Sequence, residues 1–312
     1  MKQTEYCYEV EPGDQIRIDK FLSDQLPEIS RSQIQRMIEG GNVTQNGLMV
    51  EKASVKVQAN DEIRILVKEE NEDGLVPEYF PLDIVFEDEH VILINKPAGV
   101  VVHPGAGNTS GTLVNALLAY NPPIREVGEK ERPGVVHRID KDTSGILVFA
   151  KSKKAYKWLV SQFKSRQVRK TYLTLVDGHP PTPTGRIEAP IERDPRSRTR
   201  MKVGLRGHGK PAVSEYFELE RFINHTLLEV HPMTGRTHQI RVHLSYLGIP
   251  VVGDTLYGRR HPSLEVVRFF LHASSLTIRL IGERVPRTFK VPLAVDLQTV
   301  LQDLRLKERK SS

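Results

Sequence analysis

Cysteine is nearly absent from this chain of 312 residues, and long hydrophobic runs are missing. Cys7 is the single cysteine, which excludes an intrachain disulfide and a thiolate metal cluster. No segment approaches the roughly 18 consecutive apolar residues that a membrane-spanning helix needs. The first seven residues also lack the apolar segment of a signal peptide. We therefore expect a cytoplasmic protein that does not enter a membrane.

Several familiar cofactor and catalytic motifs are missing as well. Ser110 stands where the loop 95–107 would need the last glycine of G-x-G-x-x-G, and no P-loop occurs, so we exclude a nucleotide cofactor. His238 and His243 are five residues apart, without the H-E-x-x-H arrangement of a zinc site. Ser144 lies in Asp-Thr-Ser-Gly-Ile, which does not match the G-x-S-x-G of a hydrolase. We expect neither a cofactor nor a metal.

Positive charge is in moderate excess and is concentrated in two clusters. The chain has 45 Lys and Arg against 39 Asp and Glu, a formal net charge of +6. The first cluster is Arg138, Lys141, Lys151, Lys153, Lys154, Lys157, Lys164, Arg166, Arg169 and Lys170. The second cluster is Arg193, Arg196, Arg198, Arg200, Lys202, Arg206 and Lys210. A single such run would indicate only solubility, but two clusters on either side of an acidic turn favour a polyanion. Arginines in a glycine-containing loop suit RNA.

The chain divides by its patterns into two domains and a linker. Residues 14–67 predict two helices followed by a small sheet, that is, a small α/β domain. Residues 68–81 are acidic, contain Gly and Pro and have no periodicity, so they predict a linker. Residues 82–306 predict the larger domain. Its expected strands are 84–86, 91–94, 145–150, 172–176, 213–219, 226–231 and 271–278, and its expected helices are 112–120, 153–167, 238–246 and 296–306. Without strict βαβ alternation, this order favours an α+β class with a central mixed, mainly antiparallel sheet flanked by helices.

The most distinctive segment is 137–145, His-Arg-Ile-Asp-Lys-Asp-Thr-Ser-Gly, which opens directly into a predicted strand. A strand fixes the direction of a side chain well, so Asp140 or Asp142 could act as a nucleophile. The segment 235–243 supplies basic residues on a predicted helix, and a nearby arginine favours an ionised carboxylate. The alternative is that Asp142 caps the turn while Asp140 pairs with Arg138 at the surface. The residues alone leave both interpretations open.

Four motifs together resemble the ribosomal large subunit pseudouridine synthases, in particular the D-type members with an N-terminal RNA-binding domain. They are Lys-Pro-Ala-Gly at 96–99 with His-Pro at 103–104, the segment 137–145, Lys-Thr-Tyr-Leu at 170–173, and the segment 235–243 with Gly-Asp at 253–254. The similarity extends over nearly the whole chain. Residues 14–67 resemble the small alpha-L RNA-binding domain, with Ile-Asp-Lys-Phe-Leu at 18–22 and Ser-Arg-Ser at 30–32.

The resemblance implies a cofactor-independent isomerisation of uridine to pseudouridine by base flipping. It makes Asp140 the nucleophile, which attacks either the ribose or the pyrimidine ring. It makes Tyr172 the residue that packs on the base and helps to remove the ring proton. Arg241 is then the basic partner that keeps Asp140 charged, and residues 142–144 hold the turn.

The resemblance also implies RNA contacts. Arg138 fills the gap that the flipped nucleotide leaves in the stack, and Arg236 lies near phosphate. The full set of predicted RNA-binding residues is Arg138, Arg236, His238, Lys96, Arg31, Arg198 and Lys202. The expected partner is large-subunit ribosomal RNA within a pre-ribosomal particle, at a stem-loop with several uridines. Two alternatives stay open, namely a transfer-RNA pseudouridine synthase and a non-catalytic ribosome-assembly factor that binds RNA.

Overall fold

The computed structural model describes residues 3–12, 16–68, 75–105, 108–197, 199–204, 208–259 and 262–311. The chain divides into two compact units, Met1–Gly74 and Leu75–Ser312. Each unit has its own hydrophobic core. In the described ranges, no helix is both long enough and apolar enough to span a membrane.

The first unit combines two helices with a small antiparallel sheet. Its strands pair in the order β1 (Gln3–Glu9), β4 (Glu62–Lys68), β2 (Val43–Gln45) and β3 (Leu48–Met49). The helices α1 (Ile18–Gln25) and α2 (Arg31–Glu39) share one buried apolar cluster with the sheet.

Local sequence accounts for the limits of these elements. Ser30 and Gln33 have the sequence of a capping box at the start of α2, and the Gln33 side chain accepts a hydrogen bond from the Ser30 N–H at 2.9 Å. Asn46 and Gly47 have φ angles of +53° and +77°, the left-handed pair that a tight hairpin between β2 and β3 requires.

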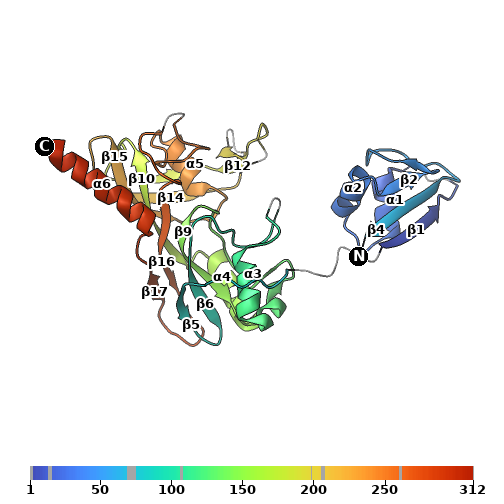
Figure 1. The fold of residues 1–312 in the computed structure, drawn as a ribbon, viewed down its shortest axis with the longest axis horizontal. Coiled ribbons are helices and arrows are strands. Elements are labelled where there is room, and N and C mark those ends of the chain that lie inside the picture. The colour runs from blue at the N-terminus through green and yellow to red at the C-terminus, as the bar shows by residue number, and fades with distance from the viewer. Residues whose placement is uncertain are drawn as a thin grey trace. The chain divides into compact units, whose positions relative to one another are not determined.

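The second unit is built around a nine-stranded sheet, coloured from teal to red in Figure 1. The strands follow the order β11 (Thr184–Glu188), β14 (Val213–Arg221), β15 (His225–Pro232), β10 (Arg169–Asp177), β16 (Leu271–Ile278), β9 (Ser144–Ala150), β6 (Val91–Lys96) and β5 (Ile84–Glu87), with β17 (Arg287–Lys290) paired to β16. All of these pairs are antiparallel except β16 with β9. Two small hairpins lie outside this sheet, β7 (Gly128–Glu129) with β8 (Arg132–Pro133) and β12 (Ile191–Arg193) with β13 (Met201–Val203).

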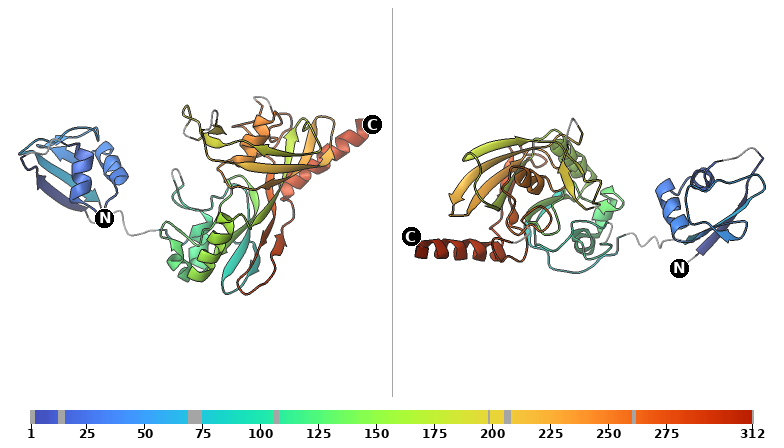
Figure 2. Two further views of the ribbon diagram at one scale, coloured as in Figure 1. Left: turned by 180° about the vertical axis from the view of Figure 1, so that it is seen from behind. Right: turned by 90° about the horizontal axis from the view of Figure 1, so that it is seen from above.

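Helices cover different parts of this sheet. The helices α3 (Leu113–Tyr120) and α4 (Lys153–Lys164), together with the short 3-10 helix η1 (Pro122–Glu126), lie away from α5 (Gln239–Tyr246) in Figure 1 and in the left-hand view of Figure 2. Helix α4 packs next to β9, while α5 packs next to β13, β14 and β15. The last helix is α6 (Val295–Ser311). The predicted α+β class with a mixed, mainly antiparallel sheet is confirmed.

The strand β1 was missed by the sequence analysis. It pairs with β4 over seven residue pairs, although it precedes residue 14, where we placed the start of the small domain. Tyr6, Tyr8 and Val10 alternate with Cys7 and Glu9, which is the two-residue period of a strand, and Tyr8 and Val10 pack on the core, so the sequence did carry a signal for β1. The limits 14–67, 68–81 and 82–306 remain predictions.

Candidate active site

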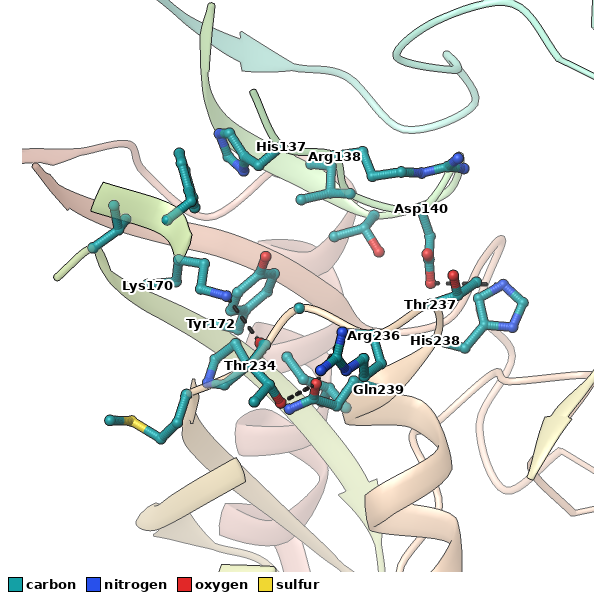
Figure 3. Close-up of a pocket in the computed structure, with 18 of the residues that line it drawn as sticks. His137, Arg138, Asp140, Lys170, Tyr172, Thr234, Arg236, Thr237, His238 and Gln239 are labelled. Atoms are coloured by element: carbon teal, nitrogen blue, oxygen red, sulfur yellow. Dashed lines mark hydrogen bonds and ion pairs between the residues drawn. The ribbon is translucent and has the colours of Figure 1, made fainter. Parts of the chain in front are cut away.

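A cavity of about 510 Å³ lies in the second unit. It is lined by parts of the segments 136–143, 163–172 and 232–241, and by Leu271. Figure 3 shows Asp140 pointing toward His238, and Lys170 pointing toward Thr234. The cavity therefore brings together three of the four motifs that the sequence analysis singled out.

Asp140 lies in the turn that leads into β9. The Thr143 N–H donates a hydrogen bond to the Asp140 carbonyl and closes this turn. At the start of the strand, Gly145 has a φ angle of +114°, and a Cβ atom there would lie 2.2 Å from the Ala273 carbonyl oxygen. Only glycine fits this position. The Asp140 side chain remains 20% exposed, so it is held in place and is still accessible.

Arg241 connects Asp140 to a second, buried carboxylate. Its Nε and Nη2 donate to Asp254 at 2.6 and 2.9 Å, and its Nη1 donates to Asp140 at 3.2 Å. The guanidinium also lies 4.2 Å from the centre of the Phe269 ring. Burial alone would lower the pKa of Arg241, but its two carboxylate partners raise it overall. A permanent positive charge therefore stands beside Asp140.

Asp254 was not recognised as a functional residue, although it belongs to the Gly-Asp pair of the fourth motif. It is buried, and it also accepts the N–H groups of Leu256 and Tyr257. This arrangement orients two of the three guanidinium nitrogens, which leaves Nη1 for Asp140. A carboxylate a dozen residues after an arginine gives no sequence signal of this pairing, which depends on the tertiary fold.

His238 lies at the start of α5 in a left-handed conformation, with a φ angle of +56°. Its Nδ1 is 2.8 Å from the Tyr257 hydroxyl, and its Nε2 is 4.0 Å from Asp140 Oδ2. Burial lowers the pKa of this histidine, although the charge of Asp140 acts in the opposite direction. His238 is thus part of the immediate surroundings of Asp140.

Tyr172 approaches the same cavity from β10. It is 9% exposed, and burial together with the negative charge of Asp140 raises the pKa of its phenol well above the usual range. Its neighbours on the cavity wall are also affected by burial, which lowers the pKa of His137 to about 3 and that of Lys170 to about 8. At neutral pH, therefore, Tyr172 keeps its proton and His137 is uncharged.

The rim of the cavity is cationic. Arg138, Lys164, Arg166 and Arg236 line it together with Arg241, while Asp140 is the one acidic residue in the lining. Arg138 is exposed, and Arg236 donates from Nε to the Pro211 carbonyl at 3.1 Å. A polyanion is the complementary ligand.

The prediction that Lys96 binds RNA is wrong in this structure. The side chain is fully buried, and its ammonium group donates to the carbonyls of Pro97, Val100 and Lys141 at 2.7 to 2.8 Å. Burial lowers the pKa of Lys96 to about 7. Lys96 therefore does not face RNA. Its hydrogen bonds join the loop after β6 to Lys141, the residue that follows Asp140.

The remaining predicted RNA-binding residues are not among those that line this cavity, or they lie outside the described residues. Arg31 begins α2 in the first unit and pairs with the buried Asp19 at 3.0 Å. Lys202, on β13, pairs with Glu192 at 3.2 Å. Arg198 lies outside the described residues.

The site offers acid, base and aromatic groups rather than a ligand set for a metal. Across the residues that the structure describes, no three His, Cys, Asp or Glu side chains lie close enough together to hold a metal ion. The cavity can present one accessible carboxylate, held by an arginine, to the neutral aromatic ring of a ligand. Tyr172 can pack against that ring.

Comparisons with known proteins agree with this chemistry. Residues 90–246 match the RNA pseudouridylate synthase family, and residues 16–63 match the S4 domain. An uncharacterized RNA pseudouridine synthase of Chloroflexus aurantiacus is 48% identical, over 93% of this chain and 90% of the relative. The ribosomal large subunit pseudouridine synthase D of Escherichia coli K12 is 39% identical, over 93% of this chain and 90% of the relative.

A solved structure agrees as well. Human RNA Pseudouridylate Synthase Domain Containing 1 superposes with a TM-score of 0.54 at 30% identity, covering 72% of this chain and 95% of the human one. The chain therefore belongs to the RNA pseudouridylate synthase family: it is an RNA pseudouridine synthase, an isomerase, with an N-terminal S4 domain that binds RNA.

Proposed function

We propose that this enzyme modifies uridines of large-subunit ribosomal RNA and that Asp140 is its nucleophile. The target is supported by relatives named ribosomal large subunit pseudouridine synthase D, found in Xylella fastidiosa, Haemophilus ducreyi and Escherichia coli. Their identities to this chain lie between 39% and 48%. The nucleophile is supported by one observation above all, the exposed Asp140 carboxylate held by Arg241 Nη1 inside the cavity.

The reaction follows from this geometry. A uridine flipped out of its stack enters the cavity, and Arg138 at the rim takes part of the vacated space. The Asp140 carboxylate attacks the ribose or the pyrimidine ring, and the bond between N1 and the sugar breaks. The uracil turns and rejoins the same sugar carbon through C5, and the bond that Asp140 formed to the substrate breaks, which returns the free carboxylate. The C5 proton leaves and N1 gains one, so atoms and electrons balance without a cofactor.

Tyr172 is proposed to pack against the uracil while it turns. Its raised pKa means that the phenol holds its own proton at neutral pH. A protonated phenol cannot accept the C5 proton, so the direct role in proton removal that the resemblance implies is disfavoured. Contact with the ring remains.

RNA is proposed to contact the protein through Arg138, Arg236 and His238, which line the cavity, and also through Arg31, Lys202 and Arg198. The first three lie next to Asp140 or on the same cavity wall. Transfer RNA is the competing substrate. The non-catalytic assembly factor is not supported, because the family is one of isomerases.

The test uses purified protein with unmodified transcripts of large-subunit ribosomal RNA and of transfer RNA, followed by mapping of pseudouridine. We expect product in the ribosomal transcript with wild-type protein and none with Asp140→Ala, which should bind RNA with nearly unchanged affinity. Asp142→Ala is the matched control, because it removes the other carboxylate of the same turn and should retain product. Product in transfer RNA alone would overturn the target. Product from Asp140→Ala would overturn the nucleophile.

A further inference from the structure

The turn that carries Asp140 enters the sheet at a weakly paired joint. Strands β9 and β16 pair in parallel through only two residue pairs, Ser144 with His272 and Gly145 with Ala273. On its other side, β9 pairs with β6 through six residue pairs. Backbone hydrogen bonds therefore hold the start of β9 to β16 over a very short distance, directly after the catalytic turn.

Arg268 adds side-chain bonds at this joint. Its Nη1 donates to the Asp142 carbonyl at 2.9 Å, and its Nη2 donates to the Ser144 hydroxyl at 2.9 Å. Ser144 Oγ also lies 2.9 Å from His272 Nδ1. Because burial lowers the pKa of His272 to about 4, this ring is neutral, and its Nδ1 can accept a hydrogen bond from the Ser144 hydroxyl, whose oxygen accepts from Arg268. Arg268 thereby contacts both residues 142 and 144, just beyond Asp140.

Arg268 is itself oriented by a carboxylate. Its Nε and Nη2 donate to the two oxygens of Asp296, at 2.6 and 3.1 Å. Asp296 lies in the first turn of α6, and the Arg268 side chain is only 8% exposed. Charge-assisted, bidentate hydrogen bonds of this kind are directional as well as strong. With Asp296 holding one side of the guanidinium, Nη1 and Nη2 donate to the turn, and Nη1 also donates to the Leu271 carbonyl of β16 at 3.3 Å.

We propose that Arg268, oriented by Asp296, is a positioning residue that fixes the catalytic turn and so sets where the Asp140 carboxylate stands. This inference rests on the proposed function in one respect, namely that Asp140 is the group that reacts. The rate of such chemistry depends steeply on the position of the reacting group, because a displacement of about 1 Å can lower the rate by on the order of 100-fold. The alternative is that Arg268 only attaches α6 to the rest of the fold.

The same helix offers a matched control. Arg305 of α6 donates a bidentate pair to Glu220 of β14, at 2.5 to 3.1 Å, so it attaches α6 to the sheet without touching the turn. A purely structural role for Arg268 predicts that Arg268→Ala and Arg305→Ala behave alike. A positioning role predicts that they differ in rate and not in RNA affinity.

The experiment measures single-turnover pseudouridine formation with the full chain, at increasing protein concentration, on the transcript that the wild-type protein modifies. For Arg268→Ala we expect a maximal rate constant lower by about 30- to 100-fold. The half-saturating protein concentration should stay within about twofold of wild type, because no RNA-facing group changes. Arg305→Ala should keep its rate within about twofold. Equal rates for the two variants would overturn the proposal, as would a change confined to the half-saturating concentration.

Two further variants keep the test decisive if Arg268→Ala does not fold. Asp296→Asn leaves Arg268 in place but removes the charge that orients it, and we expect a rate lower by about 3- to 10-fold. Arg268→Lys keeps the charge and loses the bidentate geometry, so it should restore folding without restoring the rate. Wild-type rate in both variants would overturn the proposal. An inactive wild-type protein would instead count against the proposed substrate, and active Asp140→Ala against the nucleophile.

Discussion

Asp19 in the first unit and Asp140 in the second both face arginine side chains, but they differ in how many further hydrogen bonds their carboxylates can accept. Asp19 is fully buried and accepts five, from Arg17, Arg31 and Gln35. Among the described residues, only Arg241 donates to the Asp140 carboxylate. A carboxylate has about four lone-pair positions, so Asp19 is saturated and Asp140 is not.

An arginine partner alone therefore does not mark a reactive carboxylate. Asp254 makes the point within the active site, because it shares Arg241 with Asp140. It accepts two guanidinium N–H groups and two backbone N–H groups, and it is buried. Saturated carboxylates stabilise the fold, whereas the unsaturated one keeps oxygens free for a substrate.

The largest effect is expected from Asp140→Asn. The carboxamide keeps the size of the side chain and can still accept from Arg241, so the melting temperature should stay within about 2 °C of wild type. The nucleophile is lost, and the single-turnover rate should fall by at least ~10⁴-fold. Calorimetry measures the melting temperature, and single-turnover product formation measures the rate. A variant within tenfold of the wild-type rate would remove Asp140 from the chemistry.

Asp254→Asn should lower the stability of the fold as well as the rate. Removing one partner of a buried ion pair leaves the other charge uncompensated, which typically costs about 3–5 kcal/mol. We expect the free energy of unfolding of the second unit to fall by about this amount in urea titrations, and the rate to fall because Arg241 loses its orientation. If Asp254→Asn proved as stable as Asp140→Asn, the distinction between saturated and unsaturated carboxylates would fail.

Much of the site was predictable because its residues lie in contiguous motifs. The turn 137–145 leads into a seven-residue strand in which every residue is buried. A short continuous run of apolar residues such as 146–150 is consistent with a buried strand. Arg241 was assigned as the partner of Asp140 from a resemblance, and the structure brings the two side chains to 3.2 Å. The catalytic role of the pair remains a prediction.

What the sequence could not reveal depends on contacts between distant segments. Lysines are rarely buried, so a surface position was the natural expectation for Lys96. Two of its carbonyl partners, Pro97 and Val100, lie in the loop that follows it, but the third, Lys141, is 45 positions away and meets it only in the folded chain. Arg268 reaches residues 142 and 144 from over 120 positions away. No periodicity or spacing encodes such a contact.

Asp19→Asn should have a moderate effect, confined to the first unit. Burial by itself raises the pKa of Asp19, but hydrogen bonds from its arginine and glutamine partners lower it from 3.8 to about 2. Because the pKa is lowered in the folded state, the ionised Asp19 stabilises the fold above about pH 3.8. This stabilisation is lost as the pH falls toward about 2. The shift corresponds to about 2 kcal/mol.

Hydrogen exchange of the α1 amides in the full chain measures this effect at pH 6. We expect faster exchange in Asp19→Asn than in wild type, and no change in the single-turnover rate at saturating protein. The difference between the two proteins should shrink on acidification below about pH 3. Equal exchange at pH 6 would show that the five hydrogen bonds contribute nothing net.

The smallest effect is expected from Lys202→Gln, which changes an exposed lysine, in contrast to Asp19 and Asp140, whose carboxylates are held by arginines. Lys202 is 41% exposed and pairs with Glu192, so its charge is neither buried nor saturated. Loss of one exposed phosphate contact should weaken RNA binding by about two- to threefold and lower the salt dependence of affinity by about one ion. Arg221→Gln is the control, because Arg221 forms a similar exposed pair with Glu218 on β14 and is not a predicted RNA contact. If both substitutions changed affinity and its salt dependence equally, the effect would reflect net charge alone, and Lys202 would not be a specific contact.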